Sequence, residues 1–291
     1  MKPTDLAELL LLAAIWGASF LFMRISSPEF GPLTLALLRV GGASLFLLPL
    51  LALRQSLQPL RRHAPALLGA GFLNSALPFA LYAYAALHIP TGLSSILNAT
   101  VPMWGGLVAW VWLGQAPTRW RVLGLLLGFA GVAALVWAKT GLSFNASLWA
   151  VLACLFATLN YAIGAVATRK WLSEVPPLAV ATGSQLGATV WLLPLGLWAW
   201  PAQAPSATAW ASLAALALLC TGVAYIFYFR LMARVGPTNA VTVTFLIPVF
   251  AILWGALFLS EALTLGMLGG GLLVLAGTAL ALGLWPRREQ A

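Results

Sequence analysis

Long apolar runs, separated by short breaks that contain Gly, Pro or charged residues, follow one another along the whole chain. A run of about 20 apolar residues is long enough to cross a bilayer as an α-helix. The sequence lacks the alternation of polar and apolar positions that a membrane β-barrel requires. We therefore expect an all-α integral membrane fold of ten transmembrane helices. They lie at residues 5–25, 32–53, 66–87, 92–113, 119–137, 147–168, 178–199, 207–230, 238–259 and 264–284.

Composition agrees with this pattern. Hydrophobic residues make up 62% of the 291 residues and charged residues only 7%, and the mean hydropathy is +0.97. A soluble domain carries roughly 25% charged residues, so this chain cannot assemble a water-facing surface. Residues 63–118 and 175–229 contain no Asp, Glu, Lys or Arg, and each stretch has room for two spans.

The chain also repeats itself. Residues 79–137 match residues 225–283 at an offset of 146, and the first fifty residues repeat at an offset of 145. The matched positions include Tyr82 with Tyr228, Asn98 with Thr244, Pro102 with Pro248, Gly124 with Gly270 and Trp16 with Tyr161. We expect two copies of one unit, at residues 1–145 and 146–291. Since each copy has five helices, the second enters the membrane from the opposite side, which is the inverted repeat typical of carriers.

The formal charge of +9 reflects topology. When Lys and Arg residues are assigned to alternate sides of the ten spans, twelve fall on one side and two on the other. This bias predicts that both termini are cytoplasmic. The basic side can contact anionic lipid headgroups, and we expect no nucleic-acid partner.

Several motifs resemble a known family. Residues 16–20 (Trp-Gly-Ala-Ser-Phe) look like the tryptophan-glycine signature of EamA-type transporters in the drug/metabolite transporter superfamily, and Arg39 matches their usual arginine in the second helix. Residues 100–115 and 246–261 resemble the family's doubled proline-to-glutamate motif, with Gln115 in place of the first glutamate. The resemblance covers essentially the whole chain. It implies a bacterial-type inner-membrane transporter, most similar to the YddG-type exporters of aromatic and other neutral amino acids.

The candidate substrate site begins with three prolines. Proline cannot donate a hydrogen bond to the carbonyl four residues earlier, so Pro78, Pro102 and Pro248 each free a carbonyl within an apolar span. The freed carbonyls belong to polar residues, an arrangement that is useful beside a cavity and wasteful against lipid. The alternative is that these prolines only bend helices while polar side chains hold neighbouring helices together. The residues with freed carbonyls are Asn74, Asn98 and Thr244.

Aromatic residues within the spans complete the candidate site. Together they suit a pocket for an apolar side chain, although any single one also fits ordinary packing. The aromatic members of the candidate binding set are Trp16, Tyr82, Tyr161, Tyr225 and Tyr228.

Three further residues are candidates for gating or orientation. Glu8 lies about one turn inside the first helix, and its alternative role is an N-terminal acid facing headgroups. Arg39 either draws a substrate carboxylate, pairs with carbonyls of another helix or extends to the headgroups. Its repeat equivalent is Ser184, so the repeat does not require it, and we favour a structural role. Gln185 is a polar residue in the corresponding helix of the second copy.

These features favour a transporter over an enzyme. His63 and His88 lie between spans, and Cys154 and Cys220 lie in separate spans without metal-ligand companions, so we expect no catalytic residue, metal or cofactor. No acid lies clearly at a midplane, which favours a facilitator of neutral amino acids without obligatory ion coupling. The alternatives are a proton-coupled multidrug or metabolite exporter of the same superfamily and a non-transporting membrane assembly protein. The exact substrate, direction of flux and oligomeric state are left open.

Overall fold

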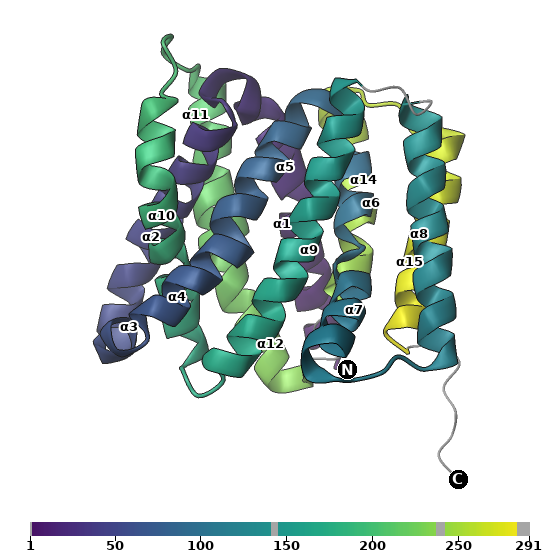
Figure 1. The fold of residues 1–291 in the computed structure, drawn as a ribbon. Coiled ribbons are helices and arrows are strands. Elements are labelled where there is room, and N and C mark those ends of the chain that lie inside the picture. Colours follow the sequence, from purple (N-terminus) through teal and green to yellow (C-terminus); the bar gives the residue numbers. More distant parts are fainter. Residues whose placement is uncertain (1, 141–144, 237–241, 284–291) are drawn as a thin grey trace.

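The fold consists of helices that run roughly parallel or antiparallel to one another in a single bundle (Figure 1). It is taken from a computed structural model that describes residues 2–140, 145–236 and 242–283, and no strand occurs among them. Eight helical segments of 20–29 residues are long and apolar enough to span a membrane, and two apolar helices of 17 residues accompany them. The all-α membrane fold is thus confirmed.

The spans follow the expected order. The first half contains α1 (Pro3–Phe30), α2 (Pro32–Arg54), a third span made of α4 (Ala64–Gly71), η1 (Phe72–Ala76) and α5 (Leu77–His88), a fourth made of α6 (Thr91–Asn98) and α7 (Val101–Leu113), and α8 (Arg119–Thr140). The short helix α3 (Gln58–Arg62) precedes the third span. The second half contains α9 (Ala146–Trp171), α10 (Pro177–Trp198), a third span made of α11 (Ala207–Ala214), η2 (Ala215–Val223) and α12 (Ala224–Val235), α14 (Val243–Leu259) and α15 (Leu265–Ala281).

The helix expected at 92–113 is broken into two pieces. It ends at Asn98, turns at residues 99 and 100, and resumes as α7 with Pro102 at its second position. A proline is well tolerated there because the first N–H groups of a helix have no partner within it. Pro102 therefore begins the second piece of this span after a two-residue turn, and does not lie in the middle of a continuous helix. The first residues of the corresponding prediction at 238–259 lie outside the described residues, and Pro248 lies inside α14.

Each third span contains a π-helical segment at its centre. The Leu77 N–H donates to the carbonyl of Phe72 in η1, and the Ala224 N–H donates to that of Leu219 in η2, five residues back in both cases. The two segments overlap when the repeat offset of 146 is applied. Only the first is followed by a proline, Pro78, so the π turn belongs to the repeated unit and does not depend on proline. Such turns are rare and frequently mark functional sites.

The two halves exchange their first helices. Helix α1 packs against α14, α11 and α12 of the second half, and α9 packs against α5 and α7 of the first. Helices α2 and α10 contact each other, and each also contacts the π segment of the opposite half. Because α1 is the first span and α9 the sixth, these two helices start at opposite ends of the bundle (Figure 1).

Glycines allow the closest helix approaches. Helices α8 and α15 pair at one edge of the bundle (Figure 1), where Gly124 and Gly131 face backbone atoms of α15. Gly17 of the tryptophan-glycine signature lies against α14, since a Cβ added there would be 2.8 Å from Phe250 Cβ and 2.9 Å from the Ala251 nitrogen. Gly124 and Gly131 of α8 therefore serve helix packing within the chain.

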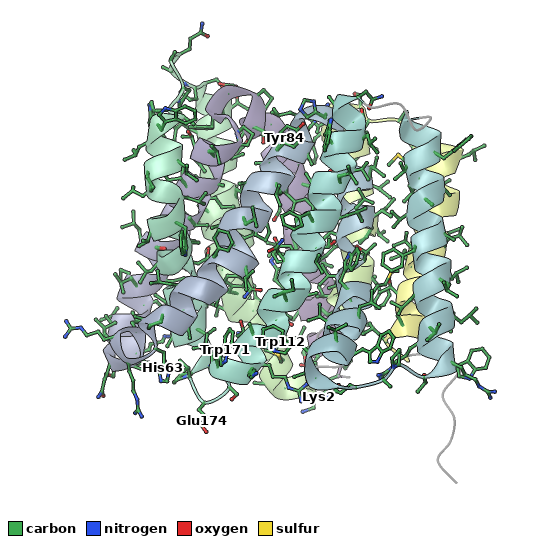
Figure 2. All side chains as sticks on the ribbon, viewed as in Figure 1. Lys2, His63, Tyr84, Trp112, Trp171 and Glu174 are labelled. Atoms are coloured by element: carbon green, nitrogen blue, oxygen red, sulfur yellow. The ribbon has the colours of Figure 1, made fainter. Side chains whose placement is uncertain are left out.

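Aromatic and charged side chains gather at the ends of the bundle. The Trp112 and Trp171 rings meet edge to face with centroids 5.8 Å apart, near the end at which Lys2, His63 and Glu174 lie (Figure 2). Lys170 lies 5.5 Å from the Trp112 centroid. Aromatic rings with adjacent cations are typical of a membrane–water interface.

The packing at Gly17 gives a test of the interlocked fold. We expect Gly17→Ala to lower the apparent Tm of the detergent-solubilised protein, because the added methyl meets backbone atoms of α14 and overpacking of this kind costs about 1–3 kcal/mol. Gly105→Ala in α7 is the matched control, since nothing lies within 4 Å of a Cβ built there. An equal Tm for the two variants in a thermal-shift assay would contradict the close α1–α14 contact.

Candidate functional site

Tyr82 lies at the centre of the predicted site. Its side chain is 3% exposed, and its hydroxyl donates to Asn98 Oδ1 at 3.1 Å. Its ring contacts Phe20 edge to face with centroids 5.7 Å apart, and Tyr161 in a stacked arrangement at 6.2 Å. Residues from both halves thus meet here, because Tyr82 and Asn98 belong to the first copy and Tyr161 to the second.

A second aromatic pair lies one turn away along α1. Trp16 and Tyr228 have ring centroids 5.2 Å apart, and both are half-buried. Since Trp16 and Phe20 are four residues apart on one helix, the two groups form one continuous surface. We call it the aromatic track, and its members are Trp16, Phe20, Tyr82, Tyr161 and Tyr228.

Beside the track lies a polar cluster between the halves. Gln185 Nε2 on α10 donates to Ser75 Oγ on η1 at 2.8 Å, and Arg39 Nε on α2 donates to Thr221 Oγ1 on η2 at 3.0 Å. The Tyr225 side chain interacts with Ser75 and Gln185 and lies near Arg39. We call Arg39, Ser75, Gln185, Thr221 and Tyr225 the polar cluster. Arg39 therefore does not extend to the headgroups, because Thr221 lies in the middle of its 29-residue span.

The remaining predicted residues lie outside these two groups. Asn74 Nδ2 donates to Thr168 Oγ1 on α9 at 3.2 Å, and Pro78 is buried at the start of α5. Pro102 lies at the start of α7, and Pro248 and Thr244 lie on α14, where Pro248 is buried.

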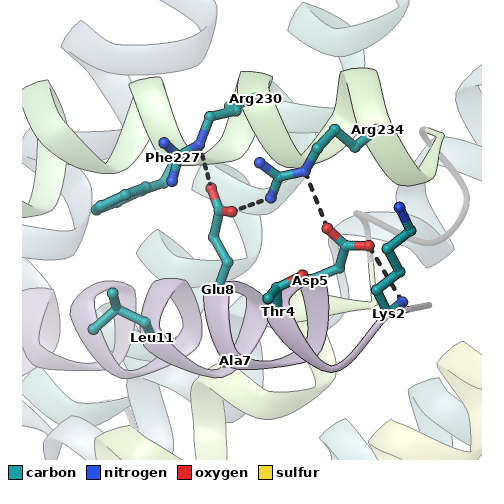
Figure 3. A pocket seen from close by; sticks show the side chains of 9 residues that line it. All are labelled: Lys2, Thr4, Asp5, Ala7, Glu8, Leu11, Phe227, Arg230 and Arg234. Carbon is teal, nitrogen blue, oxygen red and sulfur yellow. Dashed lines mark hydrogen bonds and ion pairs between the residues drawn. The ribbon is translucent and has the colours of Figure 1, made fainter.

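Glu8 lies in an ionic contact between the halves. Its Oε1 accepts from Arg230 Nε on α12 at 2.9 Å, its Oε2 accepts from Arg234, and Arg234 Nε donates to Asp5 Oδ1 at 3.0 Å (Figure 3). Both carboxylate residues are largely buried, at 8% and 7% exposure. The alternative in which Glu8 only faces headgroups is therefore wrong. We call these four residues the N-terminal clamp.

A cavity of about 740 Å³ lies at this clamp. Leu11 and Phe227 line it, and the sticks in Figure 3 show both beside the ion pairs. Trp16, where the aromatic track begins, lies five residues further along α1 than Leu11.

A second ionic contact holds the other end of α1. Glu261 follows α14 and accepts hydrogen bonds from the Thr91 N–H at 2.9 Å and the Thr91 hydroxyl at 2.6 Å, and Arg24 Nε lies 3.8 Å from Glu261 Oε1. We call Arg24, Thr91 and Glu261 the C-terminal clamp. In the first half, Gln115 is exposed and takes no such part.

Sequence reasoning missed both clamps and the Ser75–Gln185 contact. One signal was present for the cluster, since Ser75 and Thr221 are 146 residues apart and thus occupy equivalent places. The clamps had no comparable signal, because Glu8 and Arg230 are separated by 222 residues and pair only after folding.

The site has the properties of a binding and passage site. In the described residues no group of three His, Cys, Asp or Glu side chains is close enough to hold a metal ion. Buried aromatic rings, one buried guanidinium and several hydroxyl and amide groups converge between two inverted halves. Such sites near the middle of inverted repeats define the class of membrane transporters.

Comparison with known proteins agrees with this class. The model of the EamA-like transporter family matches residues 6–137 and 148–283, so the chain belongs to this family. The two matches correspond to the two copies of the repeat, and the family indicates a transporter and not an enzyme.

The chain is similar to three named bacterial proteins. It is 28% identical over 276 residues to the uncharacterized transporter YvbV of Bacillus subtilis, covering 92% of this chain and 88% of the other. It is 28% identical over 278 residues to a probable terminal-alkyne amino-acid exporter of Streptantibioticus cattleyicolor, covering 94% and 91%. It is 28% identical over 277 residues to the uncharacterized inner membrane transporter YedA of Escherichia coli K12, covering 94% and 89%.

A solved structure shares the fold. One crystal structure superposes on 99% of this chain and 100% of its own chain with a TM-score of 0.69, at 19% sequence identity.

The N-terminal clamp gives a test of the contact between α1 and α12. We expect Glu8→Gln to raise the rate at which a membrane-impermeant thiol reagent labels Leu12→Cys in inverted vesicles, in a Cys154→Ala/Cys220→Ala background. Leu12 is fully buried and lies four residues after Glu8, on the same face of α1. The increase should reach up to about fivefold, because a partly exposed ion pair is worth roughly 0.2–1 kcal/mol. Glu174→Gln is the matched control, since this exposed acid lies at the same end (Figure 2). Equal labelling rates in the two variants would contradict a closing role for the clamp.

Proposed function

We propose that this protein is an inner-membrane transporter of neutral amino acids, including aromatic ones, and of similar small metabolites. The observation that carries the proposal is the aromatic track directly beside the polar cluster. A buried aromatic surface suits an apolar side chain, and hydroxyl, amide and guanidinium groups suit a polar head. The similarity to an amino-acid exporter supports the same substrate class.

The proposed mechanism is alternating access between the two halves. Helix α1 carries a clamp near each end, and both clamps join it to the second half. Breaking the N-terminal clamp opens the 740 Å³ cavity towards Trp16, and breaking the C-terminal clamp opens the path from the other side. We place the boundary between the halves near residue 145, and both termini in the cytoplasm on the basis of the charge bias. If the termini are cytoplasmic, a membrane-impermeant thiol reagent should label Leu11→Cys from the cytoplasmic side only.

The substrate path is tested with purified protein in liposomes. We expect labelled phenylalanine, tyrosine or leucine to enter, and Asn98→Trp to abolish the flux because the indole fills the space beside the Tyr82 hydroxyl. Leu126→Trp on α8 is the control, since Leu126 is 64% exposed and lies at the lipid-facing edge of the bundle.

Two results would count against this proposal. Absence of flux for every amino acid in the wild type would point to another metabolite or to a non-transporting assembly protein. Equal flux in the two tryptophan variants would show that substrate does not pass Asn98.

We further propose that transport is facilitated, without obligatory ion coupling. Proton- or sodium-driven carriers commonly place a carboxylate within the membrane interior. Among the described residues every carboxylate lies near a helix end, namely Asp5, Glu8, Glu29, Glu174 and Glu261.

The absence of coupling has a direct test. In liposomes with equal substrate on both sides, we expect an imposed pH or sodium gradient to drive no accumulation, because the described carboxylates lie near helix ends and none lies beside the polar cluster to link ion and substrate. Uphill uptake driven by the pH gradient alone would instead support the proton-coupled exporter. A substrate gradient imposed on the same preparation is the positive control for active protein.

A further inference from the structure

Arg39 is the one buried cation in the part of the chain that the structure describes, with 6% exposure. The arginines of the clamps pair with Asp5, Glu8 or Glu261, whereas no described carboxylate lies within 4.0 Å of the Arg39 guanidinium. Removing an ion from water costs several kcal/mol unless a counter-charge or good hydrogen bonds compensate for it. A charge kept in the membrane interior without a protein partner is therefore a candidate for binding a ligand.

The neighbours of Arg39 compensate for this cost only in part. Besides Thr221 Oγ1, the acceptor within reach is the Met23 sulfur, at 3.6 Å from Nη1, and the Phe79 ring centroid lies 3.6 Å from Cζ. A thioether is a weak acceptor, and a guanidinium carries five N–H donors in a fork that matches a carboxylate. The site thus offers a cation with donor capacity and no anion.

A complementary acceptor lies in the same cluster. Gln185 is fully buried, its Nε2 donates to Ser75, and its Oε1 has no hydrogen-bond partner among the described residues. A buried amide oxygen without a hydrogen-bond partner destabilises the folded protein, and an ammonium donor from a ligand would supply the missing partner. Tyr225 connects the two positions, because it interacts with Gln185 and lies near Arg39.

The repeat explains why these two groups lie together. Arg39 reaches from the second helix of the first half to Thr221 in the π segment of the second half, and Gln185 makes the equivalent contact to Ser75 in the opposite direction. The halves thus present a cation on one side and an uncharged amide on the other. This combination complements an amino-acid zwitterion, whose carboxylate suits the cation and whose ammonium group, on the same carbon, suits the amide oxygen.

We propose that Arg39 binds the carboxylate of the transported amino acid and that Gln185 Oε1 accepts a hydrogen bond from its ammonium group. This inference rests on the proposed function. The aromatic track then holds the side chain, since Tyr161 lies near Arg39 and stacks on Tyr82. Arg39 and Gln185 would thereby bind the carboxylate and ammonium groups that all amino acids share. The aromatic track would bind the side chain, in which they differ.

Competition in liposomes tests this assignment. Uptake of labelled phenylalanine is measured against unlabelled phenylalanine, phenylalanine amide, which lacks the carboxylate, and 3-phenylpropionate, which lacks the ammonium. In the wild type we expect both analogues to inhibit about tenfold to a hundredfold more weakly than phenylalanine, because each loses a charge-assisted hydrogen bond. Arg39→Gln should remove the preference for phenylalanine over the amide. Gln185→Leu should remove the preference over 3-phenylpropionate.

The controls separate recognition from folding. Arg54→Gln neutralises an exposed arginine at the end of the same helix and should leave both preferences unchanged. If Arg39→Gln does not fold, Arg39→Lys keeps the charge without the fork and should reduce the preference over the amide. Stabilisation of each variant by phenylalanine or its amide in a thermal-shift assay replaces flux where flux is too low.

Two outcomes would overturn the assignment. Wild-type inhibition that is equal for phenylalanine and its amide would do so, as would equal loss of affinity for both compounds in Arg39→Gln or Arg39→Lys. If the wild type transports no amino acid at all, the proposed function fails instead, so the two failures can be told apart.

Discussion

The exchange of α1 and α9 between the halves is the constraint on which the rest of the structure depends. Helices satisfy their backbone groups internally, but their polar side chains must still be hidden from lipid. Neither half can cover these side chains alone, because the first helix of each half lies in the other. Gly17 makes the exchange possible by letting α1 reach the α14 backbone. The polar cluster and both clamps therefore form only where both halves are present.

This arrangement gives the two halves unequal tasks despite their common fold. The π segments, the tyrosines at 82 and 228 and the glycines of α8 and α15 follow the repeat. Two of the charges do not, because Arg39 corresponds to Ser184 and Glu261 to Gln115. In the proposed mechanism, the unshared charges of this common scaffold let one half orient the substrate while both halves move. Among the described residues, the ion pairs that would set the preferred conformation involve α1 and not α9.

The sequence was sufficient for the architecture and for part of the site. Apolar length and the repeat predicted ten helices in their observed order, and mid-span position predicted the meeting of Tyr82, Asn98 and Tyr161. The sequence did not predict the π turns, because a change of hydrogen-bond register is not marked by any residue type. Segment η2, for example, contains no proline. The sequence did not predict the ion pairs either, because their partners are more than 200 residues apart and are brought together only by the packing of the helices. The sequence marked Arg39 as a candidate, but the direction of its side chain depended on Thr221 in another helix.

The charge of Arg39, which has no carboxylate partner among the described residues, also affects small cations that are not substrates. A fixed positive charge in a narrow, weakly polar passage creates an electrostatic barrier for small cations, as arginines do in water-selective pores. Protons and sodium ions would meet this barrier each time the halves rearrange. A carrier whose transport is not coupled to an ion gradient must still prevent ions from leaking through it, because other proteins depend on those gradients. In the proposed mechanism, the same guanidinium would also prevent leakage of small cations across the membrane during transport.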